Sequence, residues 1–152
     1  MNLQPLLGLR KWTLLLAVTL LVSLANNLAA SHLVAGFISY AKEPLTNSNT
    51  YRFRLTLYRD CAGSALANSF NVSARSLSGC SSNKTINVKR VLSTVANPNP
   101  SLQTPVCVGT KTTCNGGTII GIEQYVFEGV RDLGAACPDW EFSITISARN
   151  CG

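Results

Sequence analysis

The segment "YRFRLTLYRDC", residues 51–61, constrains the fold most, because apolar and polar residues alternate in it almost without interruption. Side chains alternate between the two faces of a β-strand, so the segment predicts a strand with one packed face and one wet face. Cys61 has the parity of the apolar set and is expected to point toward the rim of the core. The two sets are Phe53, Leu55 and Leu57 on the packed face and Arg52, Arg54, Thr56 and Tyr58 on the wet face.

The segment "DWEFSITISARNCG", residues 139–152, repeats this alternation and predicts a second clear strand. Two further segments, "HLVAGFISY" (32–40) and "EQYVFEGV" (123–130), are predicted strands without clean alternation, which is typical where both faces are covered. Weaker strand patterns occur in "NVSARSL" (71–77) and "TINVKRVL" (85–92). The faces of the last strand are expected to be Phe142, Ile144, Ile146 and Ala148 inward, with Glu141, Ser143, Thr145, Ser147 and Arg149 outward.

Turn-forming residues separate these segments, as in "TNSNT", "SGCSSN", "CNGG" and "LGAACP". The first two strands, joined through "TNSNT", predict an antiparallel hairpin. Short strands without a crossover helix indicate an all-β, antiparallel β-sandwich or barrel-like fold. The stretch "VANPNPSLQTP", residues 95–105, contains three prolines and predicts a long exposed loop.

Residues 1–30 have the layout of a signal peptide, in which Arg10 and Lys11 precede the apolar run 12–24 and small residues follow it. The run is shorter than the roughly 20 residues that a membrane-spanning helix needs. We therefore expect a signal-peptide helix at 1–30 and a single secreted β-rich domain at 31–152, located outside the cell or on its surface, with no stable membrane span after cleavage. Retention of the segment as an anchor is the alternative.

The net charge of +6 comes from scarce acidic residues rather than abundant basic ones, since only 13% of the residues are charged. A nucleic-acid partner is not expected, because the basic residues are dispersed and the chain is predicted to be exported.

An even number of cysteines in an exported chain predicts disulfides. Their spacings lack the close pairs of a zinc site, and the lone histidine, His32, lies near the predicted mature terminus, so no metal, cofactor or catalytic residue is expected. Sequence does not select among the possible pairings, and neighbours in the chain are the default: Cys61 with Cys80, Cys107 with Cys114, and Cys137 with Cys151. Each bridge would contribute about 2–4 kcal/mol.

Four segments in this order, "SHLVAGFISY", "YRFRLTLYRDC", "TTCNGGTIIGIEQYVFEGV" and "CPDWEFSITISARN", resemble the amino-terminal module of large secreted or surface proteins of Bacteroidota. Those proteins are often gliding-motility-associated or adhesin-like. The resemblance implies an extracellular β-rich module without catalytic residues, followed by PKD-like or immunoglobulin-like repeats and a type IX sorting domain.

The chain also departs from that family. Ser147 and Ala148 stand where the family often has adjacent cysteines, so its disulfide scheme is not transferred. Relatives continue where this chain stops at Gly152, and a truncated chain is expected.

Two interpretations exist for Arg59 and Asp60. They form either a ligand-binding or acid–base pair, or the end of the strand, where Asp60 caps the turn and Cys61 fastens it. The second is favoured, and an exposed pair would contribute only about 0–1 kcal/mol.

Arg52, Arg54 and Tyr58 on the wet face form the candidate binding surface. Trp140 and Phe142 could offer a sugar platform, but core packing is favoured. The expected function is a non-catalytic interaction or architectural unit of an adhesin-like or gliding-associated protein, with a protein or glycan as its partner, bound by rigidly presented loops. A secreted carbohydrate-binding module or hydrolase-associated domain is the alternative.

Overall fold

The computed structural model describes residues 33–44, 49–134 and 136–146. The predicted signal peptide and His32 lie outside these ranges. None of the helical structure in the described ranges is long and apolar enough to cross a membrane. The elements of the described part are strands β1 (Leu33–Lys42), β2 (Thr50–Asp60), β3 (Ser69–Ser76), β4 (Lys84–Arg90), β5 (Ser101–Leu102), β6 (Ile122–Asp132) and β7 (Trp140–Ser143), with a 3₁₀ turn η1 (Thr113–Asn115) before β6.

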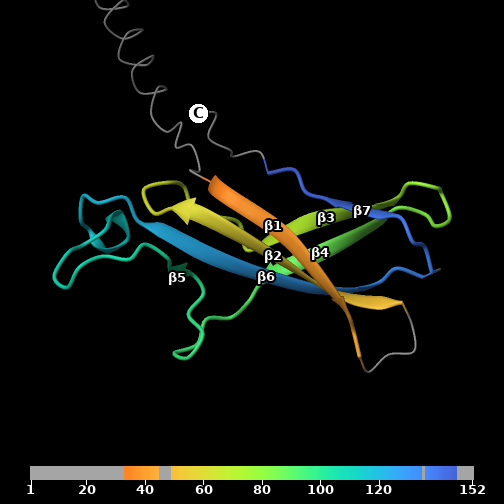
Figure 1. Cartoon of the computed structure of the whole chain (residues 1–152), viewed down its shortest axis with the longest axis horizontal. Helices are drawn as coiled ribbons and strands as arrows, with labels where there is room; N and C mark the ends of the chain where they lie inside the picture. The colour runs from red at the N-terminus through yellow and green to blue at the C-terminus, as the bar shows by residue number, and fades with distance from the viewer. Residues whose placement is uncertain (1–32, 45–48, 135, 147–152) are drawn as a thin grey trace, which may run out of the picture.

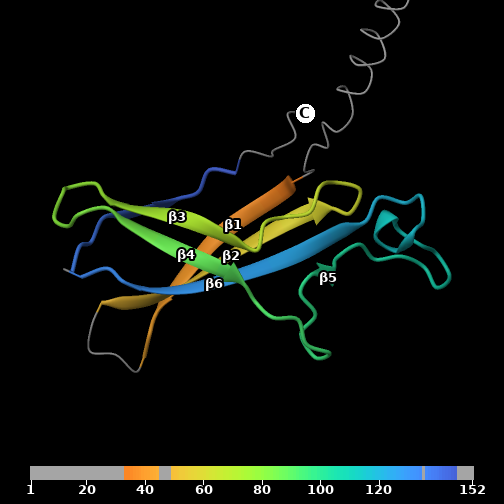
Figure 2. The ribbon, with the colours of Figure 1, turned by 180° about the vertical axis from the view of Figure 1, so that it is seen from behind.

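The strands form one antiparallel sheet with the order β1-β2-β6-β4-β3-β7, and the short β5 pairs with β6. Figure 1 shows β1 across the front of the molecule with β3, β4 and β7 behind it, and Figure 2 shows the same arrangement from the opposite side. The sheet is curled until it nearly closes into a barrel, with β1 and β7 as its two edges. The all-β, barrel-like fold predicted from the sequence is thereby confirmed.

Strand β2 lies between β1 and β6, and its apolar residues alternate as expected. Thr56, expected on the wet face, is only 2% exposed, because it lies between Phe37 of β1 and Val126 of β6. Phe53, Leu55 and Leu57 are at most 1% exposed. Gly36 pairs with Leu57 on β1, and Phe127 pairs with Leu55 on β6. The predicted opening hairpin is therefore present, and its inward face forms the centre of the core.

Strand β1 differs from the prediction. It was expected to be covered on both faces, yet most of its residues are exposed, including Phe37 at 53% and Tyr40 at 58%. The reason is its position at the edge of the sheet, where β2 is its only strand partner among the described residues.

The two weaker patterns are strands β3 and β4, and their alternating apolar residues complete the other wall of the core. Strand β7 pairs with β3 from Trp140 to Ser143 and is shorter than predicted. Ile144 and Ile146 still pack against the core. Ala148 and Arg149 lie outside the described residues. The buried apolar residues are Leu33, Phe53, Leu55, Leu57, Leu66, Val72, Ala74, Ile86, Val88, Tyr125, Phe127 and Leu133.

Candidate functional site

A disulfide between Cys61 and Cys114 fastens the end of β2 to the turn η1, with the two Cα atoms 4.9 Å apart. The Cys61 N–H donates to the carbonyl of Gly121 at 2.9 Å. Asp60 caps the turn, since its Oδ1 accepts the N–H of Ala62 at 2.9 Å. The residues that end β2 thus hold the loops that precede β6.

The second disulfide joins Cys80 to Cys137. The expected pairing of sequence neighbours, Cys61 with Cys80, Cys107 with Cys114 and Cys137 with Cys151, is therefore wrong. Cys107 is an exposed free thiol, and Cys151 lies outside the described residues.

Strand order explains the observed bridges. Asp60 pairs with Ile122, so the residues after β2 meet those before β6. Ser76 pairs with Trp140 in the same way, so the residues after β3 meet those before β7. Each bridge therefore joins two ends that are distant in the chain but adjacent in the sheet.

Arg59 continues the inward direction of Leu57 and is only 8% exposed. Its Nη2 forms an ion pair with Oε2 of Glu123 at 3.0 Å, and its Nη1 donates to the carbonyl of Ser64 at 2.8 Å. The guanidinium carbon also lies 5.4 Å from the ring centroid of Tyr125. Arg59 at the end of β2 is thus joined by an ion pair to Glu123 on β6.

Tyr125 lies within this charged group. Its hydroxyl donates to Oε2 of Glu123 at 2.7 Å, and the guanidinium carbon of Arg90 lies 4.8 Å from its ring centroid. Burial, and then the hydrogen bond to Glu123, raises the pKa of Tyr125. Arg90 is held by the carbonyls of Leu66 and Ala67. The side chains of this group therefore interact with one another or with backbone carbonyls. The group consists of Arg59, Arg90, Glu123 and Tyr125.

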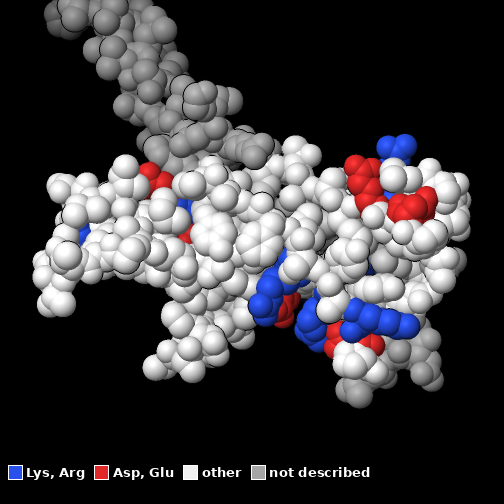
Figure 3. All heavy atoms as spheres, in the orientation of Figure 1, with Lys and Arg blue, Asp and Glu red and all other residues white. Residues whose placement is uncertain are grey.

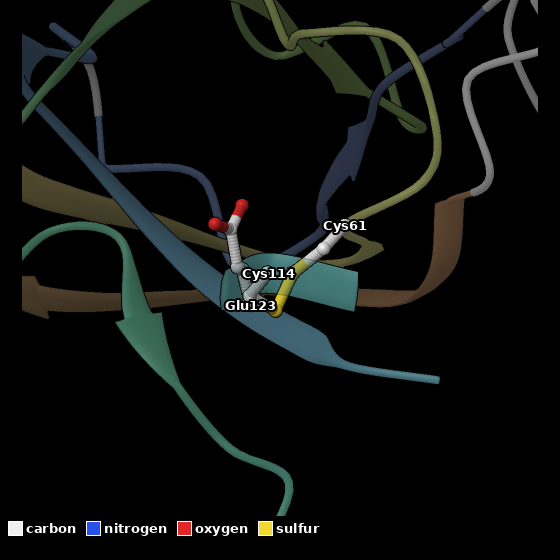
Figure 4. Close-up of side chains that lie close together, drawn as sticks. All are labelled: Cys61, Cys114 and Glu123. Atoms are coloured by element: carbon white, nitrogen blue, oxygen red, sulfur yellow. A yellow bond between two sulfur atoms is a disulfide. The ribbon is translucent and has the colours of Figure 1, made fainter. Parts of the chain in front are cut away.

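Glu123 also lies close to the Cys61–Cys114 bridge, as Figure 4 shows. A second group of this kind combines Asp139 with the Cys80–Cys137 bridge. Metal ions bind cysteine as the thiolate, and these sulfur atoms are oxidised to disulfides. Each group is left with one carboxylate, so neither of these two described groups has a donor set for a metal.

The candidate surface of Arg52, Arg54 and Tyr58 lies together on the outer face of β2, but its charges are paired. Arg52 forms ion pairs with Glu43 at 3.0 Å and with Glu128 at 3.7 Å, and Arg54 pairs with Glu128 at 2.6 Å. The Tyr58 hydroxyl accepts a hydrogen bond from Gln124. Both arginines of this surface are therefore paired with glutamates.

Trp140 and Phe142, the possible sugar platform, are half-buried and pack against the core. The ring of Phe142 lies 4.9 Å from Tyr40 and 5.0 Å from Phe53, measured between centroids. Their aromatic faces are used in packing.

The loops between β4 and β6 form a different surface, on which aliphatic side chains are exposed. The loop end, which we define as residues 91–121 between β4 and β6, has Lys111 as its sole charged residue and contains no aromatic residue. In Figure 3 most charged side chains lie in the half of the molecule that contains the β1–β2 and β3–β4 turns, whereas the opposite end, where these loops project, shows few. The exposed aliphatic residues of the loop end are Leu92, Val95, Leu102, Val106, Val108, Ile119 and Ile120.

Asn99 pins the first of these loops to the sheet and is only 8% exposed. Its Nδ2 donates to the carbonyls of Val91 at 2.7 Å and Val126 at 2.8 Å, and its Oδ1 accepts the N–H of Val126 at 3.0 Å. The asparagine side chain therefore replaces a missing strand neighbour of β6. Asn99 lies inside the segment predicted to be an exposed loop, and its burial was not predicted from the sequence.

Buried Thr112 holds the second loop, because its side chain caps the turn η1 by accepting the N–H of Cys114. Gly121 packs so closely against this turn that an added Cβ would clash with Sγ of Cys114. Gly116 ends the turn with φ of +77°, as the "CNGG" pattern predicts. The loops of the loop end are thus fixed to the sheet, and their aliphatic side chains are exposed.

Sequence reasoning also missed the loop end as a surface. The sequence does contain a signal for it, because the 31 residues of the loop end include eight aliphatic residues and only one charged residue, Lys111. Proline and turn residues predict a loop, and a local pattern of this kind does not indicate which apolar side chains of a loop remain exposed.

Comparison with known proteins returns no matching family model, no matching curated protein and no matching solved structure.

Proposed function

We propose that the chain is a non-catalytic module of an exported or cell-surface protein and that it binds another protein through the loop end. The observation that carries this proposal is the exposed aliphatic set on loops held by the Cys61–Cys114 bridge, Asn99 and Thr112. Contiguous exposed apolar surface is uncommon on monomeric proteins and marks interaction sites. Side chains already held in place lose less conformational freedom on binding.

A protein partner is favoured over a glycan. Sugar rings are typically bound on aromatic faces, and the loop end contains no phenylalanine, tyrosine or tryptophan. Val95 and Val108 are fully exposed, and they suit an apolar protein surface instead.

Two disulfides support an extracellular setting, because such bonds persist in oxidising compartments. The resemblance of the sequence to surface modules of Bacteroidota supports a role in adhesion or gliding, and the signal-peptide pattern at 1–30 supports export.

Binding of the labelled chain to intact cells that produce it tests the proposal. We expect saturable binding that weakens at least about tenfold when Val108 and Ile120 are both replaced by Ser, because central apolar contacts dominate binding energy. The matched control is Val130→Ser, which changes an exposed valine of β6 outside the loop end and should bind normally.

Treatment of the cells separates the partner classes. Protease should abolish binding and periodate oxidation of glycans should not. Loss of binding after periodate treatment but not after protease would identify the partner as a glycan. Equal binding by the wild-type chain and all variants would overturn the role of the loop end.

A further inference from the structure

Strand β1 has one edge without a strand partner in the part of the chain that the structure describes. It is the terminal strand of the sheet, and its hydrogen-bonded neighbour there is β2. A groove of about 600 Å³ lies between β1 and residues 142–146, which do not pair with it. Every residue of β1 except Leu33 and Ile38 is exposed. The backbone N–H and C=O groups along this edge are therefore open to another strand.

The edge also lacks the features that usually prevent two strands from associating. Edge strands of soluble proteins commonly carry charged residues, proline or bulges. Residues 33–41 contain no charged residue and no proline, and Lys42 is the sole charge on the strand. The irregular pairing with β2 is confined to the start of the strand, between Leu33 and Ala35. The regular part, residues 35–41, therefore favours pairing with an extended backbone.

The inward side chains of β1 are complementary to those of a second β1 that runs antiparallel to it. When a two-fold axis passes through Phe37, Gly36 of each copy lies opposite Ile38 of the other. Both residues are on the inward face, because they pair with Leu57 and Leu55 of β2. The residue without a side chain thus leaves room for a large one, twice in each dimer.

The outward side chains agree with the same axis. Phe37 is 53% exposed and lies opposite Phe37 of the other copy. Aromatic pairs directly across two strands stabilise a sheet. On either side of this pair Ala35 lies opposite Ser39, and two small residues leave space for the aromatic rings.

The charges near the edge do not oppose this contact. Lys42 lies five positions from the axis, so the two Lys42 residues are ten positions apart, roughly 30 Å at the rise of an antiparallel strand. Charges at that distance are screened in salt solution. The neighbouring Arg52 and Arg54 on β2 are paired with glutamates. Two copies with a net positive charge can therefore meet at an edge that is itself uncharged.

We propose that β1 pairs antiparallel with β1 of a second copy about a two-fold axis at Phe37, which joins two sheets into one. A second copy is favoured as the occupant because each copy presents the same open edge, and one symmetric contact satisfies both edges. This inference does not depend on the proposed function, since it uses a different surface from the loop end.

Analytical ultracentrifugation of the full chain tests the contact. We expect a dimer that dissociates on dilution, and Phe37→Lys should weaken it at least about tenfold, because it places two lysines directly opposite each other. The matched control is Leu77→Lys, which adds the same charge at an exposed leucine outside β1 and should dimerise normally.

Two results would overturn the proposal. One is a monomer at every concentration measured. The other is a dimer that Phe37→Lys leaves unchanged, and loss of that dimer when Val108 and Ile120 are both replaced by Ser would assign the contact to the loop end instead.

Single cysteines test the register, in a background where Cys107 and Cys151 are Ser. Phe37→Cys places two thiols opposite each other at the axis, and we expect a disulfide-linked dimer under mild oxidation by a glutathione redox couple, which accepts the electrons. In the control, Ser39→Cys, the two thiols are four positions apart along the strands and should remain reduced. Equal cross-linking of both variants, or of neither, would overturn the proposed register.

Discussion

Phe142 of β7 and Tyr40 of β1 contact each other across the open side of the sheet, with ring centroids 4.9 Å apart, although no strand pairing joins β1 to β7 within the described ranges. Phe142 also packs against Phe53. Side chains thus bring together two edges that the backbone ladder leaves separate.

Phe142→Ala should lower the free energy of unfolding by about 2–4 kcal/mol, because truncating a half-buried phenylalanine that packs against the core removes apolar contacts. Urea denaturation under non-reducing conditions measures this change. Val130→Ala, at an exposed position, should shift stability by no more than about 0.5 kcal/mol. Equal effects of the two variants would show that Phe142 does not hold the edges together.

Replacing Cys61 and Cys114 together by Ser should destabilise the fold by about 4 kcal/mol, given the 53-residue separation that the bridge closes. Mass spectrometry of a non-reduced digest checks the pairing itself and should recover Cys61 linked to Cys114 and Cys80 linked to Cys137. Peptides that link Cys61 to Cys80 would contradict the structure.

Asn99→Ala should destabilise by about 2–4 kcal/mol, since it leaves the backbone groups of Val91 and Val126 without their hydrogen-bond partner. Amides near Val126 should exchange faster as well. Asn97→Ala is the matched control, because Asn97 is exposed and its hydrogen bonds with Thr94 use only its backbone. A similar loss in both variants would indicate a general effect of the loop.

Protonation of Asp139 should make the free energy of unfolding depend on pH in the acid range. Hydrogen bonds from Ser78, with a smaller contribution from Ser76, lower the pKa of its carboxyl group. A group whose pKa is lower when folded stabilises the fold above its unfolded pKa, and this contribution is lost as pH falls through the folded pKa. Stability should therefore decline below about pH 4.

Asp139→Asn should weaken that decline while leaving the Cys80–Cys137 bridge intact. Thermal unfolding measured across this pH range, with Asp132→Asn as the control at an exposed carboxylate, provides the check. Identical pH profiles for the wild-type chain and Asp139→Asn would show that this carboxyl group does not couple to folding.

Alternation was enough to predict β2, because which face a side chain occupies in an extended chain depends only on its parity. On that basis the pattern places Phe53, Leu55 and Leu57 inward, and the "TNSNT" turn predicts that β1 lies beside them. The same reasoning mistook the uninterrupted apolar character of β1 for burial on both faces, since composition does not reveal whether a strand lies at an edge.

The positions of the cysteines and of Asn99 needed more than local pattern. Cys61 meets Cys114 because β6 lies next to β2, and that order follows from how all the strands curl around one core. Asn99 is buried because a gap beside β6 needs its amide, although its neighbours in the chain indicate only a loop.

The sequence by itself therefore determined the all-β class, most of the strands and the direction of their side chains, because period-two geometry is a local property of the backbone. The tertiary structure decided the disulfide pairs, the burial of Arg59 against Glu123 and the way in which the loops of residues 91–121 are fixed to the sheet. These features depend on which strands become neighbours. Strand order is set by how segments that are distant in the chain pack their apolar faces around one core.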